Sequence, residues 1–225
     1  MNQTNTDVPR TPQYHHLSGK QRFYFYCKYI LDTLFAFVAT VVFLIPMLLI
    51  ALLIKLDDRG PVFFRQTRIG RNQNTFSMLK FRTMRVDTPS EVPTHLLDSP
   101  QTYITRIGGF LRKTSLDELP QLLNILAGQM SIVGPRPALW NQYDLIAQRE
   151  LYGVHQVLPG LTGWAQVNGR DELEIPVKAA FDGDYLSHFG LWMDIRCFFL
   201  TISALFTAKG LVEGGTGTLR KSKQE

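Results

Sequence analysis

The chain has 225 residues and a formal net charge of +5, and it holds two cysteines. Cys27 and Cys197 lie far apart in the sequence, which excludes a disulfide framework and a cysteine-based metal site and indicates a reducing compartment. The basic residues come without a zinc-finger, recognition-helix or aromatic RNA-binding signature, so we expect no nucleic-acid partner.

The first predicted element is a membrane segment within residues 21–58. Thr33 to Ile54 carry no charge for 22 positions, and about 20 apolar residues suffice to span a bilayer. Pro46 removes a backbone donor, so we expect the helix to break near Ile45-Pro46. Basic residues lie on both flanks, and the positive-inside rule therefore gives a span no orientation. Two topologies stay open here: a re-entrant helix-break-helix hairpin, or an ordinary span with a proline kink.

A basic stretch follows the membrane segment. From Arg59 to Val86 there are seven Lys or Arg and no Asp or Glu. Beside a membrane such a stretch suits anionic headgroups or phosphate groups, although a solvated positive face has the same composition. Within it, residues 62–64 and 76–79 are predicted to be short strands joined by a polar turn at 71–74.

The rest of the chain is predicted to be one compact domain at residues 59–212. A flexible tail at 1–20 is predicted ahead of the membrane segment, and another at 213–225 after the domain. Prolines favour a mobile loop at 87–100. The apolar stretch 191–206 is too short to span, and it suits a core helix or one lying in the membrane interface. Other predicted helices are residues 103–111, 120–126, 138–151 and 177–189.

Two adjacent carboxylates, Asp117 and Glu118, lie at a predicted helix start. Ser115 and Glu118 have capping-box spacing, which is a sufficient structural explanation of both. With Ser115 as the cap, however, Pro120 falls where its missing N–H matters, whereas Asp117 as the cap brings Pro120 into the tolerated first turn. Both carboxylates would then lie at a helix N-terminus close to the basic Arg112, which suits Mg²⁺ and phosphate groups.

Two further patches have the composition of loops. Prolines on both sides fix the backbone around Arg136, which pre-organises it to bind a phosphate or a planar group, although a plain surface turn has the same pattern. Residues 159–170 combine three glycines with Trp, Gln and Asn, which suits a ligand-lining loop or a buried structural turn.

Four long motifs occur in order along the chain. They are KFRTM at 80–84, TSLDELPQLLN at 114–124, SIVGPRP at 131–137 and PGLTGWAQVNGRDE at 159–172. Together they closely resemble the bacterial sugar transferase family, the monotopic phosphoglycosyl transferases that start surface glycan assembly. The resemblance runs from about Lys28 to Phe206 and points to the small form of the family, a membrane hairpin with a catalytic core. One departure is Ile45-Pro46, where the family usually has Ser-Pro.

The resemblance implies transfer of a phospho-sugar from a UDP-sugar to polyprenol (undecaprenyl) phosphate, giving a polyprenyl diphosphate sugar and UMP. This is the first membrane step of surface polysaccharide or glycoconjugate assembly. Asp117 would be the nucleophile of a ping-pong reaction through an aspartyl-phosphosugar intermediate, and Glu118 would help Asp117 bind Mg²⁺. The substrate-binding residues implied by the motifs are Lys80, Arg82, Arg112, Pro135, Arg136 and Pro137.

The resemblance also implies a fold and a location. The fold is an α-rich α+β domain with a small β element, held by a re-entrant hairpin and interfacial helices at the cytoplasmic face of the bacterial inner membrane. A homo-oligomer and contacts with later glycosyltransferases of the pathway are compatible with it. Two rival functions stay open, a membrane-anchored nucleotide-sugar hydrolase and a non-catalytic assembly scaffold, and the motifs do not name the sugar.

Overall fold

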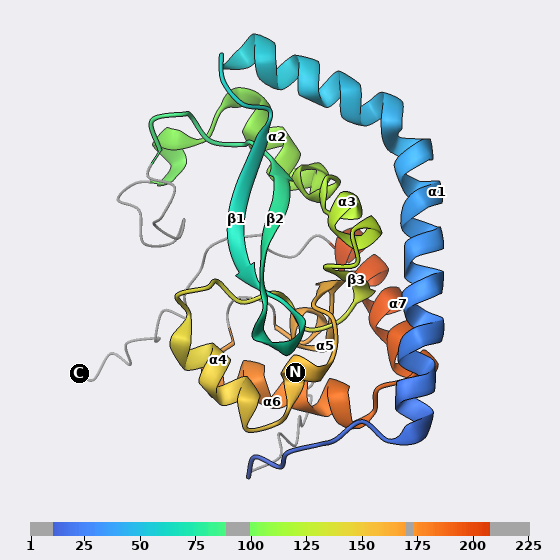
Figure 1. Ribbon diagram of the computed structural model, residues 1–225. Helices are drawn as coiled ribbons and strands as arrows, with labels where there is room; N and C mark the ends of the chain where they lie inside the picture. Colours follow the sequence, from blue (N-terminus) through green and yellow to red (C-terminus); the bar gives the residue numbers. More distant parts are fainter. Residues whose placement is uncertain (1–10, 89–99, 170–172, 208–225) are drawn as a thin grey trace, which may run out of the picture.

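A computed structural model describes residues 11–88, 100–169 and 173–207 (Figure 1). The helix-rich α+β class with a small sheet is confirmed. Most of the predicted loop at 87–100 and all of the tail at 213–225 lie outside the described residues. The α-helices are α1 (Gly19–Asp57), α2 (Arg106–Thr114), α3 (Gln121–Leu126), α4 (Tyr143–Glu150), α5 (Trp164–Val167), α6 (Ile175–Ser187) and α7 (Leu191–Thr207). The strands are β1 (Phe63–Ile69), β2 (Thr75–Phe81), β3 (Ser131–Val133) and β4 (Gly160–Thr162), and the short 3-10 helices are η1 (Arg71–Gln73), η3 (Pro100–Tyr103), η4 (Leu116–Glu118) and η5 (Val154–Gln156).

The two predicted short strands are present and form a β-hairpin, and a second small sheet accompanies it. β1 and β2 pair antiparallel with Phe64 opposite Lys80, whereas β3 and β4 pair in parallel. The polar turn between β1 and β2 holds Asn72 and Gln73 at φ values of 54° and 61°. Asn tolerates this left-handed conformation well, which explains how the turn closes although neither of these two residues is glycine.

Helix α1 is a single helix of 39 residues that contains Pro46 and is long and apolar enough to cross a membrane. Only 11% of the most apolar 18-residue stretch of α1 is buried, whereas the core helix of a soluble domain would be mostly buried. It runs along one side of the molecule and then changes direction, so that its light-blue part passes over the top of the β1–β2 hairpin (Figure 1). The bend is therefore present, although the helix continues through Ile45-Pro46 without interruption.

The N-terminal boundary of the domain differs from the prediction. Helix α1 starts at Gly19 with a full capping box between Ser18 and Gln21. Ahead of it, Leu17 is buried in the core and the His15 N–H donates to the carbonyl of Tyr152. Residues 15–18 are thus ordered rather than part of a flexible tail, because Leu17 gains an apolar site that composition does not reveal.

The domain packs around α1 and the hairpin. The first turns of α1 share a core cluster with α6 and α7, its middle shares one with β2 and α3, and its last turns pack on Phe81 and Leu111. In Figure 1 the hairpin lies in front of α2 and α3, while α4 and α6 cover the opposite end of the domain. The hairpin and α3 therefore meet where the adjacent carboxylates are found.

Candidate active site

The two carboxylates lie in a tight turn between two helices. Helix α2 ends where Ser115 adopts a left-handed conformation with φ of 56°, and the single 3-10 turn η4 follows. Helix α3 then begins after Pro120, which serves as its N-cap residue. Neither Ser115 nor Asp117 caps α3, so both predicted helix starts are wrong. The physical reason is that the left-handed Ser115 closes α2 and redirects the chain before α3 begins.

Asp117 and Glu118 share one lysine from strand β2. Lys80 Nζ lies 2.7 Å from Glu118 Oε1 and 3.9 Å from Asp117 Oδ2. The side chains of Asp117, Lys80 and Glu118 are only 4%, 15% and 17% exposed. Because Lys80 contacts both carboxylates, one oxygen of Asp117 and one oxygen of Glu118 lie close to the same ammonium group. The structure thus brings together the predicted dyad and one predicted phosphate-binding residue.

Arg136 completes this group, which we name the Lys80 cluster: Lys80, Asp117, Glu118 and Arg136. Arg136 Nη2 lies 3.5 Å from the same Glu118 Oε1 that binds Lys80. Burial by itself raises the pKa of the Glu118 carboxyl, but the charges of Lys80 and Arg136 and their hydrogen bonds outweigh burial and lower it from 4.5 to about 2. Glu118 is therefore ionised at neutral pH.

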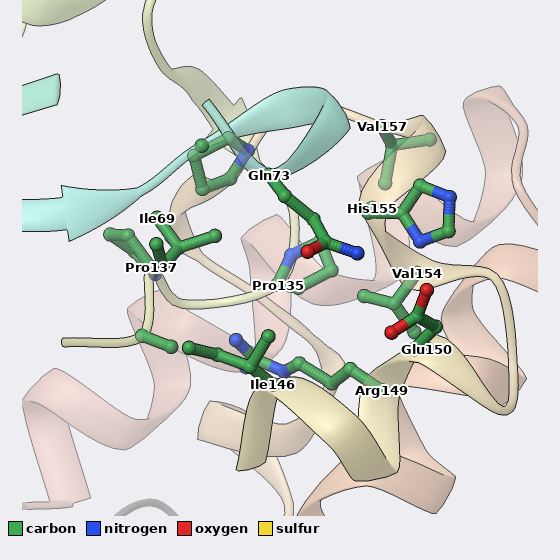
Figure 2. A pocket seen from close by; sticks show the side chains of 13 residues that line it. Ile69, Gln73, Pro135, Pro137, Ile146, Arg149, Glu150, Val154, His155 and Val157 are labelled. Carbon is green, nitrogen blue, oxygen red and sulfur yellow. The ribbon is translucent and has the colours of Figure 1, made fainter. Parts of the chain in front are cut away.

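The loop that carries Arg136 is held on both sides by backbone hydrogen bonds. The N–H of Gly160 donates to the carbonyl of Pro135 at 2.9 Å, and the N–H of Ile69 donates to the carbonyl of Ala138 at 2.9 Å. Pro135 and Pro137 are buried on either side of the partly exposed Arg136. They line a cavity of about 40 Å³ together with side chains such as Gln73, Ile146 and His155 (Figure 2).

Two other predicted substrate-binding residues have protein partners in the structure. Arg112 Nε donates to Thr83 Oγ1 at 2.8 Å. Arg82 is buried and lies away from the Lys80 cluster, with Nη1 3.0 Å from Asp58 Oδ2 and Nη2 2.6 Å from the Asp58 carbonyl. In this position Arg82 holds the end of α1 against strand β2.

The comparison with protein families assigns the chain. A family model described as bacterial sugar transferase matches residues 23–208. The chain belongs to the bacterial sugar transferase family. The match includes every residue of the Lys80 cluster and nearly all of α1 and α7.

Three curated relatives are 37% to 44% identical to the chain. The chain is 44% identical over 168 residues, 71% of its length, to a UDP-glucose:undecaprenyl-phosphate glucose-1-phosphate transferase of Escherichia coli K12. It is 40% identical over 212 residues, 89% of its length, to a protein of the same name from Xanthomonas campestris pv. campestris. It is also 37% identical over 193 residues, 80% of its length, to the exopolysaccharide production protein ExoY of Rhizobium meliloti.

These relatives differ in how much of their own length is matched. The chain spans 36% and 44% of the Escherichia coli and Xanthomonas proteins but 85% of ExoY.

The Lys80 cluster has a donor set that fits Mg²⁺. Among the described residues, no three His, Cys, Asp or Glu side chains are placed to hold a metal ion by themselves. Mg²⁺ commonly binds one or two carboxylates and completes its shell with water and substrate phosphates. Asp117 and Glu118 supply such a pair, since both lie within 4.0 Å of the one cationic atom of Lys80.

Sequence reasoning missed two polar features of this sugar transferase. The first is Arg68 on β1, whose Nη1 donates to the carbonyl of Pro137 at 2.9 Å. The second is a buried group, which we name the Lys28 cluster: Lys28, Asp32 and Asp194, with the hydroxyl groups of Tyr24, Ser131 and Tyr185. The i,i+4 spacing of Lys28 and Asp32 was a signal for the second feature, but Asp194 lies too far along the chain to be paired with them from sequence.

Proposed function

We propose that the chain transfers a phospho-sugar from a UDP-sugar to undecaprenyl phosphate, giving undecaprenyl diphosphate sugar and UMP. The observation that carries this proposal is the Lys80 cluster, in which adjacent carboxylates and two cationic side chains meet in a family-matched segment. The printed names of the Escherichia coli and Xanthomonas relatives support a polyprenyl-phosphate acceptor. ExoY supports a place in exopolysaccharide production, as the first membrane step.

The reaction proceeds in two displacements at phosphorus. A carboxylate oxygen of Asp117 attacks the sugar-linked phosphorus of the donor, the bond to the leaving phosphate breaks, and UMP departs. A phosphate oxygen of undecaprenyl phosphate then attacks the same phosphorus, and the Asp117 carboxylate leaves. An ionised aspartate needs no general base for this role. Repulsion between anions is the main barrier, and Lys80 and Arg136 reduce it by their charge.

Mg²⁺ belongs to this proposal as a cofactor held by Asp117 and Glu118. When bound, it neutralises charge on the donor diphosphate and orients it. The low pKa of Glu118 supports this assignment, because a carboxylate that is ionised at neutral pH is the form that binds a cation. The side chains of the cluster also keep water out, since Asp117 is almost fully buried.

We further propose that α1 enters and leaves the bilayer on the cytoplasmic face of the inner membrane. Both ends of α1 contact the same domain: Gln21 Nε2 donates to the carbonyl of Leu186 at 3.2 Å, and Asp58 binds Arg82. A spanning helix would have its ends on opposite sides of a hydrocarbon core about 30 Å thick. The bend in α1 and the exposed apolar side chains on both halves support a re-entrant position.

The topology is tested by cysteine labelling. Lys20→Cys and Arg59→Cys, each in a background with Cys27 and Cys197 changed to Ser, place one thiol at each exposed end of α1. In sealed vesicles, a membrane-impermeant maleimide should label both positions from the cytoplasmic side. Labelling of the two positions from opposite sides would show that α1 spans.

The function is tested by UMP release in lipid nanodiscs with a panel of UDP-sugars. Wild type and Asp117→Asn are compared with and without undecaprenyl phosphate and Mg²⁺. We expect release that needs the lipid, the metal and Asp117, with the Asn variant lower by about 10³-fold or more. The donor that supports release also identifies the sugar.

The same experiment separates the rival functions. Release without the lipid acceptor would indicate a nucleotide-sugar hydrolase. The absence of release with every donor, together with full biological function of Asp117→Asn, would indicate an assembly scaffold. Capture of a phospho-sugar on Asp117 in acid-quenched wild-type protein, detected by mass spectrometry, would support the two-step route directly.

A further inference from the structure

The β1–β2 hairpin supplies Lys80 to the Lys80 cluster and, through Arg68, contacts the loop that carries Arg136. In an antiparallel pair, residues directly opposite each other lie on one face, and the same face recurs at every second residue. Since Phe64 is opposite Lys80 and Arg68 is opposite Phe76, Lys80 and Arg68 project from the same inner face. Lys80 contacts Glu118 directly, and Arg68 lies further along this face.

Arg68 connects the hairpin to the loop that carries Arg136. Its Nη1 donates to the carbonyl of Pro137 at 2.9 Å. Its Nε and Nη2 both donate to Gln66 Oε1, at 3.1 and 2.6 Å. The planar guanidinium therefore bridges a side chain of its own strand and the backbone of the next residue after Arg136. Only a rigid fork with several donors makes both contacts at once.

We infer that Arg68, oriented by Gln66, is a positioning residue for Arg136. The hairpin then supplies the Lys80 cluster with one cation directly and fixes the second cation through a backbone carbonyl. The side chains of Lys80 and Arg136 both approach the same atom, Glu118 Oε1. The position of Arg136 relative to Lys80 therefore affects the electrostatic potential at that atom. The kinetic consequence rests on the proposed transferase function, whereas the structural consequence for the loop does not.

The kinetic experiment is a double-mutant cycle of Arg68→Gln and Arg136→Gln, with kcat/KM for the active UDP-sugar as the readout. Arg68→Gln alone should lower kcat/KM about 10-fold, but less than about 2-fold when Arg136 is already Gln, because the two residues act as one unit. Equal effects in both backgrounds would show that Arg68 does not act through Arg136, and would overturn the inference.

Two further variants separate positioning from charge. Arg68→Lys keeps the charge but loses the fork, so its kcat/KM should stay within about 2-fold of that of Arg68→Gln. Full activity of Arg68→Lys would mean that Arg68 acts by charge alone and would overturn the inference. Arg65→Gln is the matched control: it removes the same charge from the exposed face of the same strand and should leave kcat/KM unchanged.

A readout independent of turnover is hydrogen exchange of the loop at residues 134–139, measured by mass spectrometry. In the Arg68→Gln variant, the backbone amides of this loop should exchange about 5-fold faster or more than in wild type. In the Arg65→Gln variant, their exchange should not change. Unchanged exchange in Arg68→Gln would overturn the inference. If no UDP-sugar supports release by wild type, the proposed function fails and this measurement alone decides whether Arg68 positions the loop.

Discussion

The Lys80 and Lys28 clusters share one arrangement, a lysine between two carboxylates, and differ in the other groups around it. Each places one lysine between two carboxylates: Lys80 lies 2.7 and 3.9 Å from Glu118 and Asp117, and Lys28 lies 2.7 and 3.1 Å from Asp194 and Asp32. In the Lys80 cluster, Glu118 accepts from two long cationic side chains. In the Lys28 cluster, the carboxylates accept from hydroxyl groups.

Those hydroxyl groups make the Lys28 cluster a closed network. Tyr24 and Tyr185 donate to the two oxygens of Asp194 at 2.8 and 2.7 Å, and Ser131 donates to Asp32 at 2.5 Å. Such donors come from packed elements and cannot be exchanged for a ligand without unpacking the core. Flexible Lys and Arg side chains can instead turn from a carboxylate to an incoming phosphate. The type of donor, more than the charge, thus distinguishes a structural cluster from a reactive one.

The largest expected effect comes from removing the lysine of the reactive cluster. Lys80→Met should lower kcat/KM for UMP release by about 10²- to 10³-fold, because it removes a cation that offsets charge at the reacting phosphate. The free energy of unfolding should fall less than in Lys28→Met, because Arg136 still pairs with Glu118 when Lys80 is removed. A loss of activity that merely follows a loss of folded protein would remove the distinction between the clusters.

The matching substitution in the other cluster should act on stability. Lys28→Met leaves two buried carboxylates without their common cation, and the free energy of unfolding should fall by about 3 kcal/mol. The specific activity of the remaining folded protein should stay within a few-fold of wild type. Denaturant titration in nanodiscs measures the first quantity and UMP release the second, and unchanged stability would contradict a structural role.

A smaller effect concerns the metal. Glu118→Gln removes one of the two oxygen ligands assigned to Mg²⁺, so the Mg²⁺ concentration for half-maximal release should rise about 10-fold or more. Chelation by EDTA should abolish release by the wild type, and added Mg²⁺ should restore it. The same titration with Asp32→Asn, a carboxylate of the closed cluster, should give the wild-type concentration. An equal shift in both variants would argue against a metal role for Glu118.

The smallest expected effect is in the acid stability of the fold. Because the pKa of Glu118 is lowered from 4.5 to about 2, its ionised form stabilises the folded state fully above about pH 4.5 and progressively less towards pH 2. The free energy of unfolding of wild type should therefore fall more steeply than that of Glu118→Gln between these values. Parallel pH profiles of the two proteins would show that Glu118 has no such shift.

Local patterns in the sequence predicted much of the fold. The β1–β2 hairpin, a bend within α1 and the helices corresponding to α2, α3, α6 and α7 follow from periodicity, proline and turn residues, whereas the expected break at Ile45-Pro46 is absent from the continuous α1. The parallel pair β3–β4 was missed because each strand has only three residues and neither has a period to detect. The predicted start of α4 is too early, because Ala138 accepts from the N–H of Ile69 and Leu139 forms an antiparallel bridge with Arg68, long-range contacts that keep this segment out of the helix.

The candidate site was predicted in part. The motifs identified the two carboxylates, Lys80 and Arg136, and the structure brings these four together. The conformation of Ser115 was not predictable, because a left-handed serine depends on the packing of α2 against its neighbours. The partners of Arg68 and Arg82 depend on which strand faces which loop, which is long-range information that a single sequence does not contain.

The Lys28 cluster also has a consequence for the order of synthesis. Helix α1 leaves the ribosome well before Ser131, Tyr185 and Asp194, which belong to the same cluster in the folded protein. In the nascent chain, Lys28 and Asp32 lie one helical turn apart and can neutralise each other, so the helix reaches the lipid without a lone charge on that face. In the proposed membrane position, α1 can therefore insert before α7 is made, and Asp194 on α7 later attaches the folded domain to Lys28.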